Sequence, residues 1–488
     1  MENKIKKLYN QKNNNKKVII GKIYLFLIDQ KEKITMDKAR EIALKTLYKI
    51  DNEEAYSNIA LDEMIKKNNR ILNDKDIGLI SEIVYGVTTW RLTLDEVIKK
   101  YSSIKLKKIS PWILNILRMS IYQIIFLDKI PKSAAVNEGV NLAKRYGHKS
   151  SSGFVNAILR KVGKEDYEDM FRGEGIEKIC KTTSMPKWII EELNKESLNI
   201  NEISEICKCS NLRPKVSIRV NKLKTDKKEL KQKLEEKGMK VEEGILEDFL
   251  FLEKSKNIES IEEFQQGLFT VQDEAAGLTA LILKPNKGEI ILDACSSPGG
   301  KTTYIAENVE NDGIIEAWDI YEHRVKLVDQ AAKRLGITSI KTKVQDATEY
   351  KEEYFEKFDK ILLDVPCLGL GVLRRKPDIK WQRKKEDIDT ITDIQYKILS
   401  NCSKYLKPSG EIVYSTCSIL KHENQKVVQK FLDENSDFEL QEILLENNLK
   451  NGRKFFEKYL IDKQFLQVYQ NQKTDGFFIC KMRKIKKK

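Results

Sequence analysis

The chain has 488 residues, and its 88 Lys and Arg against 74 Asp and Glu give a formal net charge of +14. This length predicts two or three domains, and an apolar content of 41% excludes a chain that is disordered throughout. The positive charge favours a polyanionic partner, with nucleic acid ahead of a membrane surface. A proteome that is rich in Lys and Asn would give the same balance.

The eight cysteines form no dense framework, and the three histidines are scattered. Free thiols are typical of a reducing compartment, so we expect a cytoplasmic protein. We expect no metal site, because no CxxC pair exists and the near pair Cys207 and Cys209 lacks further ligands. The apolar stretch 18–28 carries Lys22 and is shorter than the roughly 18 residues of a membrane span. We therefore expect neither a membrane anchor nor a signal peptide.

Residues 1–35 contain nine Lys against three acidic residues. They are either a basic arm or the product of an upstream start codon, because a natural-looking start, "MDKAREIALKTLYKI", begins at Met36. The sequence leaves both interpretations open.

From Met36 to residue 169 the pattern predicts an all-helical domain. In the segment 37–50, apolar residues recur at spacings of three to four positions, which is the period of an amphipathic helix. Pro111 follows Ser110, as at the first turn of a helix. No strand-like alternation interrupts this pattern.

Residues 170–266 mix the two periods and predict a small α/β middle module. "PKWIIEELNK" is typical of a helix, whereas "KVSIRVN" alternates like a strand. "TDKKELKQKLEEKGM" indicates a charged helix that opens on a Thr/Asp cap.

Residues 267–488 predict a Rossmann-like α/β domain with a parallel, doubly wound sheet, because apolar strands alternate with helices. The predicted strands are 288–294, 313–320, 340–347, 358–366 and 410–417. Ligands bind beyond the carboxyl ends of strands in such sheets, so residues at these ends are the candidates for function.

The segment "DACSSPGGKT" follows the first of these strands and opens a helix. It is neither of the glycine-rich motifs that bind dinucleotides or nucleoside triphosphates. Gly299 and Gly300 allow close approach of a ligand to the backbone. Asp319 ends the second strand, where a carboxylate can accept from ribose hydroxyls, and Asp346 ends the third, placed for an adenine amino group. An adenosine cofactor without polyphosphate is indicated, and S-adenosylmethionine is the obvious one.

Two cysteines, Cys367 and Cys417, stand at the ends of the last two strands. A thiolate that adds to carbon 6 of cytosine makes carbon 5 nucleophilic enough to accept a methyl group. The proton on carbon 5 must then be removed before the thiol can leave. One cysteine as nucleophile, a second near that proton and Asp364 beside the base make a complete set for this reaction.

The motifs "DACSSPGGKT", "DVPC", "GLGVLRRKPDIKW" and "YSTCSI" resemble those of the RNA 5-methylcytosine methyltransferases. The helical region resembles the NusB-type RNA-binding domain of the bacterial RsmB (Sun) branch, which methylates cytosine 967 of 16S ribosomal RNA. This resemblance implies that Cys417 attacks, Cys367 assists product release, Asp364 holds the base, and Lys301 lies near cofactor and base. The residues expected to bind the cofactor are Cys295, Ser296, Ser297, Pro298, Gly299, Gly300, Lys301, Asp319, Asp346 and Asp364.

The loop "RRKPDIKW" is either a solvated loop or an RNA contact, and we favour RNA contact. The residues concerned are Arg374, Arg375, Lys376, Lys380 and Trp381, which suit phosphate contact and base stacking. Leu368 departs from the family, which usually has Ser after the proline–cysteine pair, and this change is expected at the wall of the cytosine pocket. The target base is expected in single-stranded RNA or flipped from its stack.

Three alternatives remain beside a monomeric cytoplasmic enzyme that acts on 16S ribosomal RNA before or during subunit assembly. The first is a transfer-RNA cytosine-5 methyltransferase, which the NusB-like domain disfavours. The second is a non-catalytic RNA-binding factor with a vestigial methyltransferase fold, which the complete set of thiols and acids disfavours. The third is a small-molecule methyltransferase, which the two additional domains disfavour.

Overall fold

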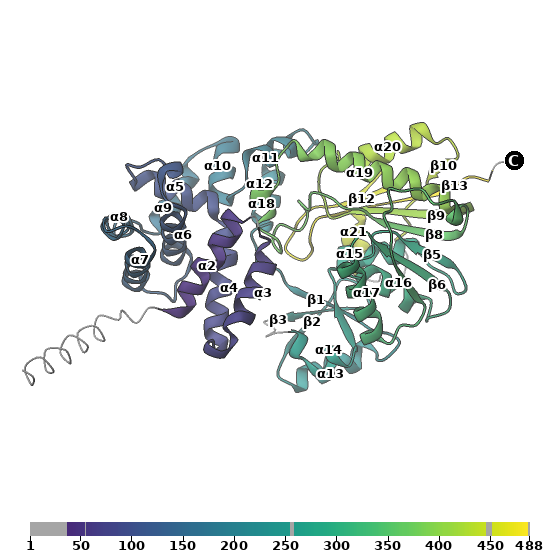
Figure 1. Ribbon diagram of the computed structural model, residues 1–488. Helices are drawn as coiled ribbons and strands as arrows, with labels where there is room; N and C mark the ends of the chain where they lie inside the picture. The colour runs from purple at the N-terminus through teal and green to yellow at the C-terminus, as the bar shows by residue number, and fades with distance from the viewer. Residues whose placement is uncertain (1–36, 54, 254–257, 446–450, 487–488) are drawn as a thin grey trace, which may run out of the picture. The chain divides into compact units, whose positions relative to one another are not determined.

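The computed structural model describes residues 37–53, 55–253, 258–445 and 451–486, and it divides the chain into two compact units, residues 1–169 and 170–488 (Figure 1). The basic extension predicted for residues 1–35 lies outside the described residues. No described helix is long and apolar enough to cross a membrane.

In the described part of the first unit every regular element is a helix, which confirms the predicted all-helical domain. The α-helices are α2 (Lys38–Asn52), α3 (Ser57–Asn68), α4 (Asp74–Thr89), α5 (Arg91–Tyr101), α6 (Pro111–Phe126), α7 (Lys132–Tyr146), α8 (Ser151–Leu159) and α9 (Glu165–Glu168). Helix α6 starts at Pro111 and forms the centre of the bundle, because it packs against α2, α4, α5, α7 and α8.

The second unit begins with three helices, α10 (Gly175–Thr183), α11 (Lys187–Asn194) and α12 (Ile200–Cys209). A four-stranded antiparallel sheet follows in the order β2-β3-β1-β4, which confirms the α/β character of the middle module. Its elements are β1 (Val216–Val220), α13 (Lys227–Glu236), β2 (Lys240–Glu243), β3 (Phe249–Glu253), α14 (Glu262–Gln265) and β4 (Phe269–Val271).

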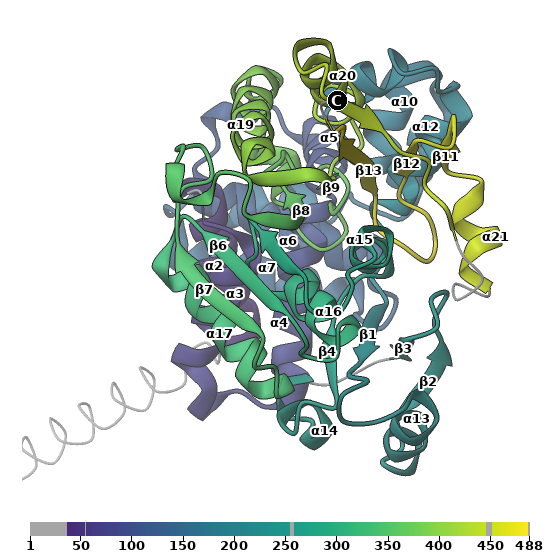
Figure 2. The same cartoon turned by 90° about the vertical axis from the view of Figure 1, so that its right-hand side faces the viewer.

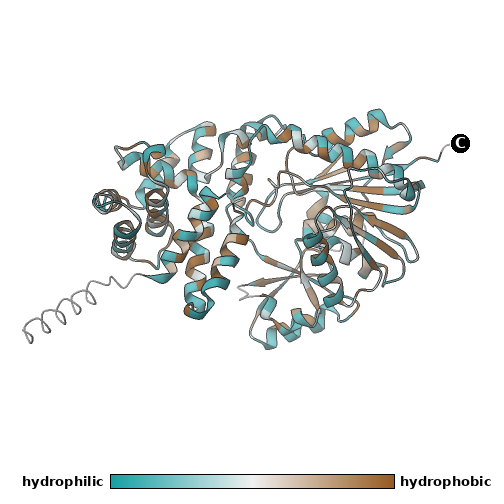
Figure 3. Ribbon diagram, in the orientation of Figure 1, coloured by the Kyte–Doolittle hydropathy of each residue, from teal (hydrophilic) through white to brown (hydrophobic). Residues whose placement is uncertain are grey.

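A large sheet forms the rest of the unit, and its parallel part has the order β7-β6-β5-β8-β9. The elements are α15 (Glu274–Leu283), β5 (Ile290–Asp293), α16 (Gly300–Asn308), β6 (Ile314–Asp319), α17 (Glu322–Leu335), β7 (Ile340–Val344), β8 (Phe358–Asp364), α18 (Ile379–Gln382), α19 (Asp387–Cys402) and β9 (Leu406–Thr416). Apolar clusters cover both faces: α15 and α16 pack on one, and α19 on the other (Figure 2). The strands are mainly hydrophobic, as expected for strands buried on both faces (Figure 3). The predicted Rossmann-like fold is confirmed.

The sheet is mixed rather than purely parallel, which corrects the prediction. Strand β13 pairs antiparallel with β9, and β12 and β10 pair antiparallel with β13. The additional elements are α20 (Gln425–Glu434), β10 (Phe438–Leu440), α21 (Asn451–Glu457), β11 (Leu460–Ile461), β12 (Phe465–Val468) and β13 (Phe477–Lys484). A hairpin from β12 brings β13 back beside β9, so no crossover helix precedes this strand.

Candidate active site

The glycine loop lies between β5 and α16 and is fixed against the neighbouring strand β6. The backbone N–H and the hydroxyl of Ser296 both donate to the carbonyl of Trp318, at 2.8 and 2.9 Å. Gly299 has a φ of +99°, a conformation that L side chains rarely adopt, and a Cβ there would lie 3.3 Å from Cα of Val328. The peptide bond between Ser297 and Pro298 is cis. The sequence thus builds a tight loop at the N-terminus of α16.

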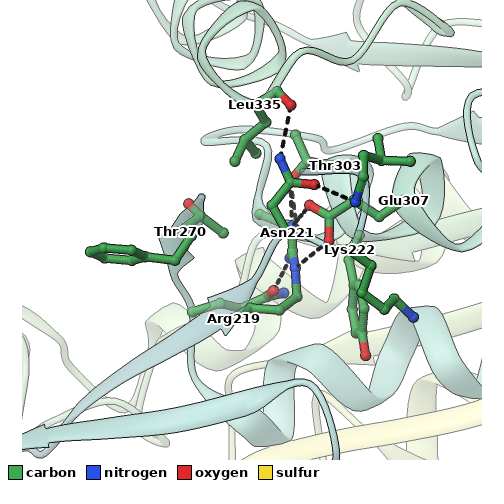
Figure 4. Close-up of polar contacts among 12 residues, drawn as sticks. Arg219, Asn221, Lys222, Thr270, Thr303, Glu307 and Leu335 are labelled. Atoms are coloured by element: carbon green, nitrogen blue, oxygen red, sulfur yellow. Dashed lines mark hydrogen bonds and ion pairs between the residues drawn. The ribbon is translucent and has the colours of Figure 1, made fainter. Parts of the chain in front are cut away.

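Arg219 of the middle module fastens the first turn of α16 from outside the large sheet (Figure 4). Its guanidinium is fully buried, donates to the carbonyl of Gly300 at 2.7 Å and pairs with Glu307 at 2.7 Å. It also donates to the hydroxyl of Thr303 at 3.0 Å. Removal of one partner of a buried ion pair is strongly destabilising, so this pair holds the middle module against α16.

Asp319 and Asp346 lie at the carboxyl ends of neighbouring strands, as predicted for an adenosine site. Asp319 is 4% exposed, accepts from the N–H of Tyr321 at 3.2 Å and pairs with Arg324 at 3.5 Å. Asp346 accepts from the N–H and the hydroxyl of Thr348 at 2.8 and 2.7 Å. The N–H of Gln345 donates to the carbonyl of Asp319 at 3.1 Å, which ties the two strand ends together.

Asp293 is a further acid at this edge that the sequence reasoning did not select. It ends β5, is 1% exposed, and its Oδ2 accepts from the hydroxyl of Thr302 at 2.6 Å. Its Oδ1 has no hydrogen-bond partner among the described residues. Burial, together with the charge of Asp364, raises the pKa of Asp293 to about 7. The sequence feature that could have identified Asp293 is its position as the last residue of the strand before the glycine loop.

The two predicted catalytic thiols meet at the ends of neighbouring strands. Sγ of Cys367 lies 3.0 Å from Sγ of Cys417, and both residues are half-buried. The pairing of β8 with β9 places Asp364 opposite Ser415, so both cysteines follow their strands to the same edge of the sheet. A hydrogen bond with Cys417 and burial raise the pKa of Cys367 well above its usual value. Cys367 therefore keeps its proton and can donate it toward the sulfur of Cys417.

An ion pair stands beside the thiols. Nζ of Lys301 lies 2.6 Å from Oδ2 of Asp364, and the hydroxyl of Ser415 donates to Oδ1 of the same carboxylate at 2.9 Å. Burial lowers the pKa of Lys301, but the negative charge of Asp364 outweighs it, so the pKa is raised overall. Lys301 is thus a cation paired with this carboxylate, near enough to the nucleophile candidate Cys417 for their charges to interact.

These features gather at the carboxyl ends of the parallel strands, where an α/β sheet binds its ligands. The described residues contain no group of three or more His, Cys, Asp or Glu that could hold a metal ion. The arrangement offers a tight backbone loop and acids for a nucleoside, next to a thiol pair and an ion pair for covalent chemistry.

Comparisons with known proteins match three parts of the chain. Residues 37–164 match the NusB family, residues 185–259 match the ferredoxin-like domain of the RsmF/B-like methyltransferases, and residues 280–483 match the family "16S rRNA methyltransferase RsmB/F". The chain is 39% identical over 449 residues to a probable ribosomal RNA small subunit methyltransferase B of Bacillus subtilis (strain 168), with 91% of this chain and 98% of the relative covered. It is 34% identical over 408 residues to the probable ribosomal RNA small subunit methyltransferase B of Synechocystis sp. (strain ATCC 27184 / PCC 6803 / Kazusa), with 83% and 91% covered.

The chain belongs to the RsmB family of ribosomal RNA methyltransferases. A methyltransferase homolog protein from Pyrococcus horikoshii has a similar structure, with a TM-score of 0.53 and 28% identity, covering 64% of this chain and 100% of that chain. Family and fold together make this chain an S-adenosylmethionine-dependent RNA methyltransferase. The loop, acids and thiols described above are the part of the chain that fits this activity.

The basic loop of this methyltransferase is largely turned inward. Arg374 is 8% exposed, donates to the carbonyl of Asn471 at 2.6 Å and pairs with Asp475 at 3.2 Å. Arg375 pairs with Asp475 and, at 3.3 Å, with Asp273. These guanidinium groups hold the loop to the turn before β13. Their bonds therefore have a structural role, which differs from the predicted contact with RNA phosphates.

The other three predicted RNA contacts differ in how exposed their side chains are. Lys380 is 1% exposed and donates to Oδ1 of Asn211 at 2.6 Å, and burial lowers its pKa to about 7. Burial of Lys380 corrects the prediction of a phosphate contact there, because an RNA phosphate cannot reach its ammonium in this structure. Lys376 is exposed, and Trp381 is half-buried. Lys376 is therefore the member of this loop that a nucleic acid reaches most easily, and Trp381 and Arg375 are partly accessible.

Leu368 does not stand at the wall of an open pocket, which corrects that expectation. It is 1% exposed and packs in the apolar cluster that α10, α11 and α12 share with residues 368–388. Ile179, Met185 and Ile189 belong to the same cluster. An apolar residue suits this position because the helices that open the second unit cover it.

Proposed function

We propose that the protein methylates carbon 5 of a cytosine in 16S ribosomal RNA through a covalent bond between Cys417 and the base. The observation that carries the proposal is the pair of thiols, 3.0 Å apart, beside the ion pair of Lys301 with Asp364. A methyltransferase that acts on a nitrogen or an oxygen atom needs no thiol pair, whereas carbon 5 of cytosine needs activation by a nucleophile. The position that the family resemblance implies is cytosine 967.

Each group of the thiol site has one task in this reaction. The thiol of Cys417 passes its proton to Asp364, and Sγ of Cys417 forms a bond to carbon 6 of the base. Protonated Asp364 then donates to the ring nitrogen and accepts from the amino group, while Lys301 stabilises the negative charge. S-adenosylmethionine supplies the methyl group that carbon 5 takes. The proton on carbon 5 then passes to a water molecule, the bond between Sγ of Cys417 and carbon 6 breaks, and the electron pair returns to the sulfur. Cys367, whose raised pKa keeps it protonated, assists release by donating to that sulfur.

The other half of the site is proposed to bind the cofactor. The loop from Cys295 to Gly300 provides backbone groups, Asp319 accepts from the ribose hydroxyls, and Asp346 accepts from the adenine amino group. The unpaired Oδ1 of Asp293 suits the ammonium group of the methionine part. No metal ion is needed for this chemistry.

The protein is proposed to act as a monomer. Its proposed substrate is 16S ribosomal RNA before or during assembly of the small subunit. The NusB-like unit and the middle module select the RNA, and Lys376 and Trp381 contact it beside the site. The cytoplasm is the proposed location, since all eight cysteines are free thiols and a pair 3.0 Å apart needs a reducing environment.

The test is methylation of unmodified 16S ribosomal RNA and of a transfer-RNA mixture with labelled S-adenosylmethionine, followed by bisulfite sequencing. We expect label in 16S RNA and one cytosine that resists bisulfite conversion. Label in transfer RNA alone would favour the transfer-RNA enzyme, and label without a resistant cytosine would refute carbon 5 as the target. RNA binding without any methyl transfer would favour the binding factor.

A further inference from the structure

A buried carboxylate, Glu423, lies behind the thiol pair and has no place in the chemistry proposed above. It is 0% exposed and stands between β9 and α20. Oε2 accepts from the N–H of Leu368 at 2.7 Å and from Nε2 of Gln395 at 3.2 Å, and Oε1 accepts from the hydroxyl of Ser418. One carboxyl group therefore takes three hydrogen bonds.

Each of these donors belongs to a residue next to a cysteine, or forms a hydrogen bond with a residue next to a cysteine. Leu368 follows Cys367, and Ser418 follows Cys417. Gln395 also donates to the carbonyl of Pro366 at 2.9 Å, on the other side of Cys367. Glu423 therefore connects the two cysteine loops through hydrogen bonds to groups one residue away from Cys367 and from Cys417.

The neighbouring Asn424 has different hydrogen-bond partners. Its Oδ1 accepts from the hydroxyl of Thr416 at 2.6 Å, and its Nδ2 donates to the carbonyl of Ser418 at 3.2 Å. Asn424 therefore bonds to the residues on both sides of Cys417, and its side-chain hydrogen bonds to described residues do not reach the loop of Cys367. One backbone bond also joins the loops, since the N–H of Gly371 donates to the carbonyl of Cys417 at 2.8 Å. Among the described residues, Glu423 is a side chain that bonds to both thiol loops directly after the cysteines, whereas the hydroxyl of Ser415 joins Asp364 before them.

We propose that Glu423 is a positioning residue that sets the distance between the sulfur atoms of Cys367 and Cys417. The proposal rests on the proposed function for the roles of the two thiols in attack and release, but the distance itself is a property of the protein alone. What the position requires is an oxygen that accepts hydrogen bonds, not a charge. Burial raises the pKa of Glu423 and so favours its uncharged form, which agrees with a position that does not require a charge.

The chain allows a sharp pair of variants. In Glu423→Gln the amide oxygen still accepts from Leu368 and Gln395, and the hydroxyl of Ser418 can reverse to accept from the amide nitrogen. Glu423→Met keeps a similar size and removes both acceptors. Glu274→Met is the matched control, because Glu274 is also 0% exposed and accepts from two backbone N–H groups, of Ile245 and Leu246, at 3.0 and 2.6 Å.

The first readout uses no RNA. Phenylarsine oxide binds two thiols that lie close together. The rate at which Cys367 and Cys417 bind it is measured from the loss of iodoacetamide labelling of the two cysteine peptides. We expect Glu423→Gln and Glu274→Met to match the parent protein, and Glu423→Met to be captured about tenfold more slowly, since small displacements of reacting groups have large effects on rate. Capture by Glu423→Met at the parent rate would overturn the proposal. If that variant fails to fold, Ser418→Ala decides, with slower capture expected and an unchanged rate as the contrary result.

The second readout is methyl transfer at saturating RNA and cofactor. We expect Glu423→Met to lower kcat about tenfold or more with little change in the affinity for S-adenosylmethionine, and Glu423→Gln to restore most of kcat. Equal losses in both variants would show that the charge matters and would contradict the proposal. If the target were not carbon 5 of cytosine, the arsenical result would stand while the adduct chemistry failed, so the two proposals fail separately.

Discussion

The two halves of the site differ in how their side chains are held. At the ends of β8 and β9, the segments beside both thiols are tied by buried hydrogen bonds to Glu423 and Asn424. At the ends of β5 to β7, Asp319 and Asp346 accept mainly from their own loops, and Asp293 keeps an oxygen with no partner among the described residues. Covalent chemistry needs a fixed distance between two sulfur atoms, whereas a cofactor needs acceptors that are still available.

The largest effect is expected at the thiol half. Cys417→Ala removes the proposed nucleophile and should lower methyl transfer by roughly 10⁴-fold or more, because the proposed reaction needs a covalent bond from this sulfur to the base. Binding of S-adenosylmethionine, measured by calorimetry, should change little, since the acids proposed to bind it lie at the ends of other strands, β5 to β7. Cys209→Ala, which removes a buried thiol outside the site, is the control and should keep its activity. Loss of cofactor binding in Cys417→Ala would contradict the division into halves.

The next effect concerns the attachment of the cofactor helix. Arg219→Met leaves Glu307 buried without its partner and should lower the free energy of unfolding by about 3–5 kcal/mol, measured by urea denaturation. Arg219→Met combined with Glu307→Leu removes both charges and should recover much of that loss. Additive losses in the double variant would show that the ion pair itself does not fasten α16.

At the cofactor half, Asp293→Asn should weaken binding of S-adenosylmethionine by about tenfold, the loss of one charged hydrogen bond. The folded-state pKa of Asp293 is about 7, above its value of about 4 in the unfolded chain, so its contribution to stability is lost as pH rises between these values. The free energy of unfolding of Asp293→Asn without cofactor should therefore fall less steeply from pH 4 to 7 than that of the parent. An identical slope would contradict the raised pKa.

The smallest effect is expected in the basic loop. Lys376→Ala should weaken RNA binding a few fold and reduce the slope of log affinity against log salt by about one, as for one lost phosphate contact. Lys380→Met should instead leave the salt slope unchanged, because its ammonium is buried against Asn211. A reduced salt slope in Lys380→Met would return this lysine to the RNA interface.

The sequence predicted that Cys367, Cys417 and Asp364 follow neighbouring apolar strands, and the structure places the two sulfur atoms 3.0 Å apart, because adjacent parallel strands bring such ends together. The catalytic roles of these residues stay predictions. The sequence missed Glu423, since a buried acid after the last parallel strand has no local pattern that separates it from a solvated one. It also missed the unpaired oxygen of Asp293, which depends on the packing around β5.

The basic loop shows the limit of reading charge from sequence. Arg375 pairs with Asp475 and Asp273, each about a hundred residues away, and no local feature of "RRKPDIKW" announces those partners. The antiparallel strand β13 was missed for a similar reason, because its pairing with β9 is set by a hairpin and not by a helical crossover. Long-range partners, rather than local propensity, decided both cases.

The measurement that tests the central claim most directly is a denaturing gel of Cys367→Ala after incubation with S-adenosylmethionine and unmodified 16S ribosomal RNA. The account predicts that a covalent complex of protein and RNA accumulates, because attack proceeds and release is slowed. It also predicts that adding Cys417→Ala abolishes the complex. Cofactor binding without any complex, or a complex that persists in the double variant, would contradict the assigned roles of the two thiols.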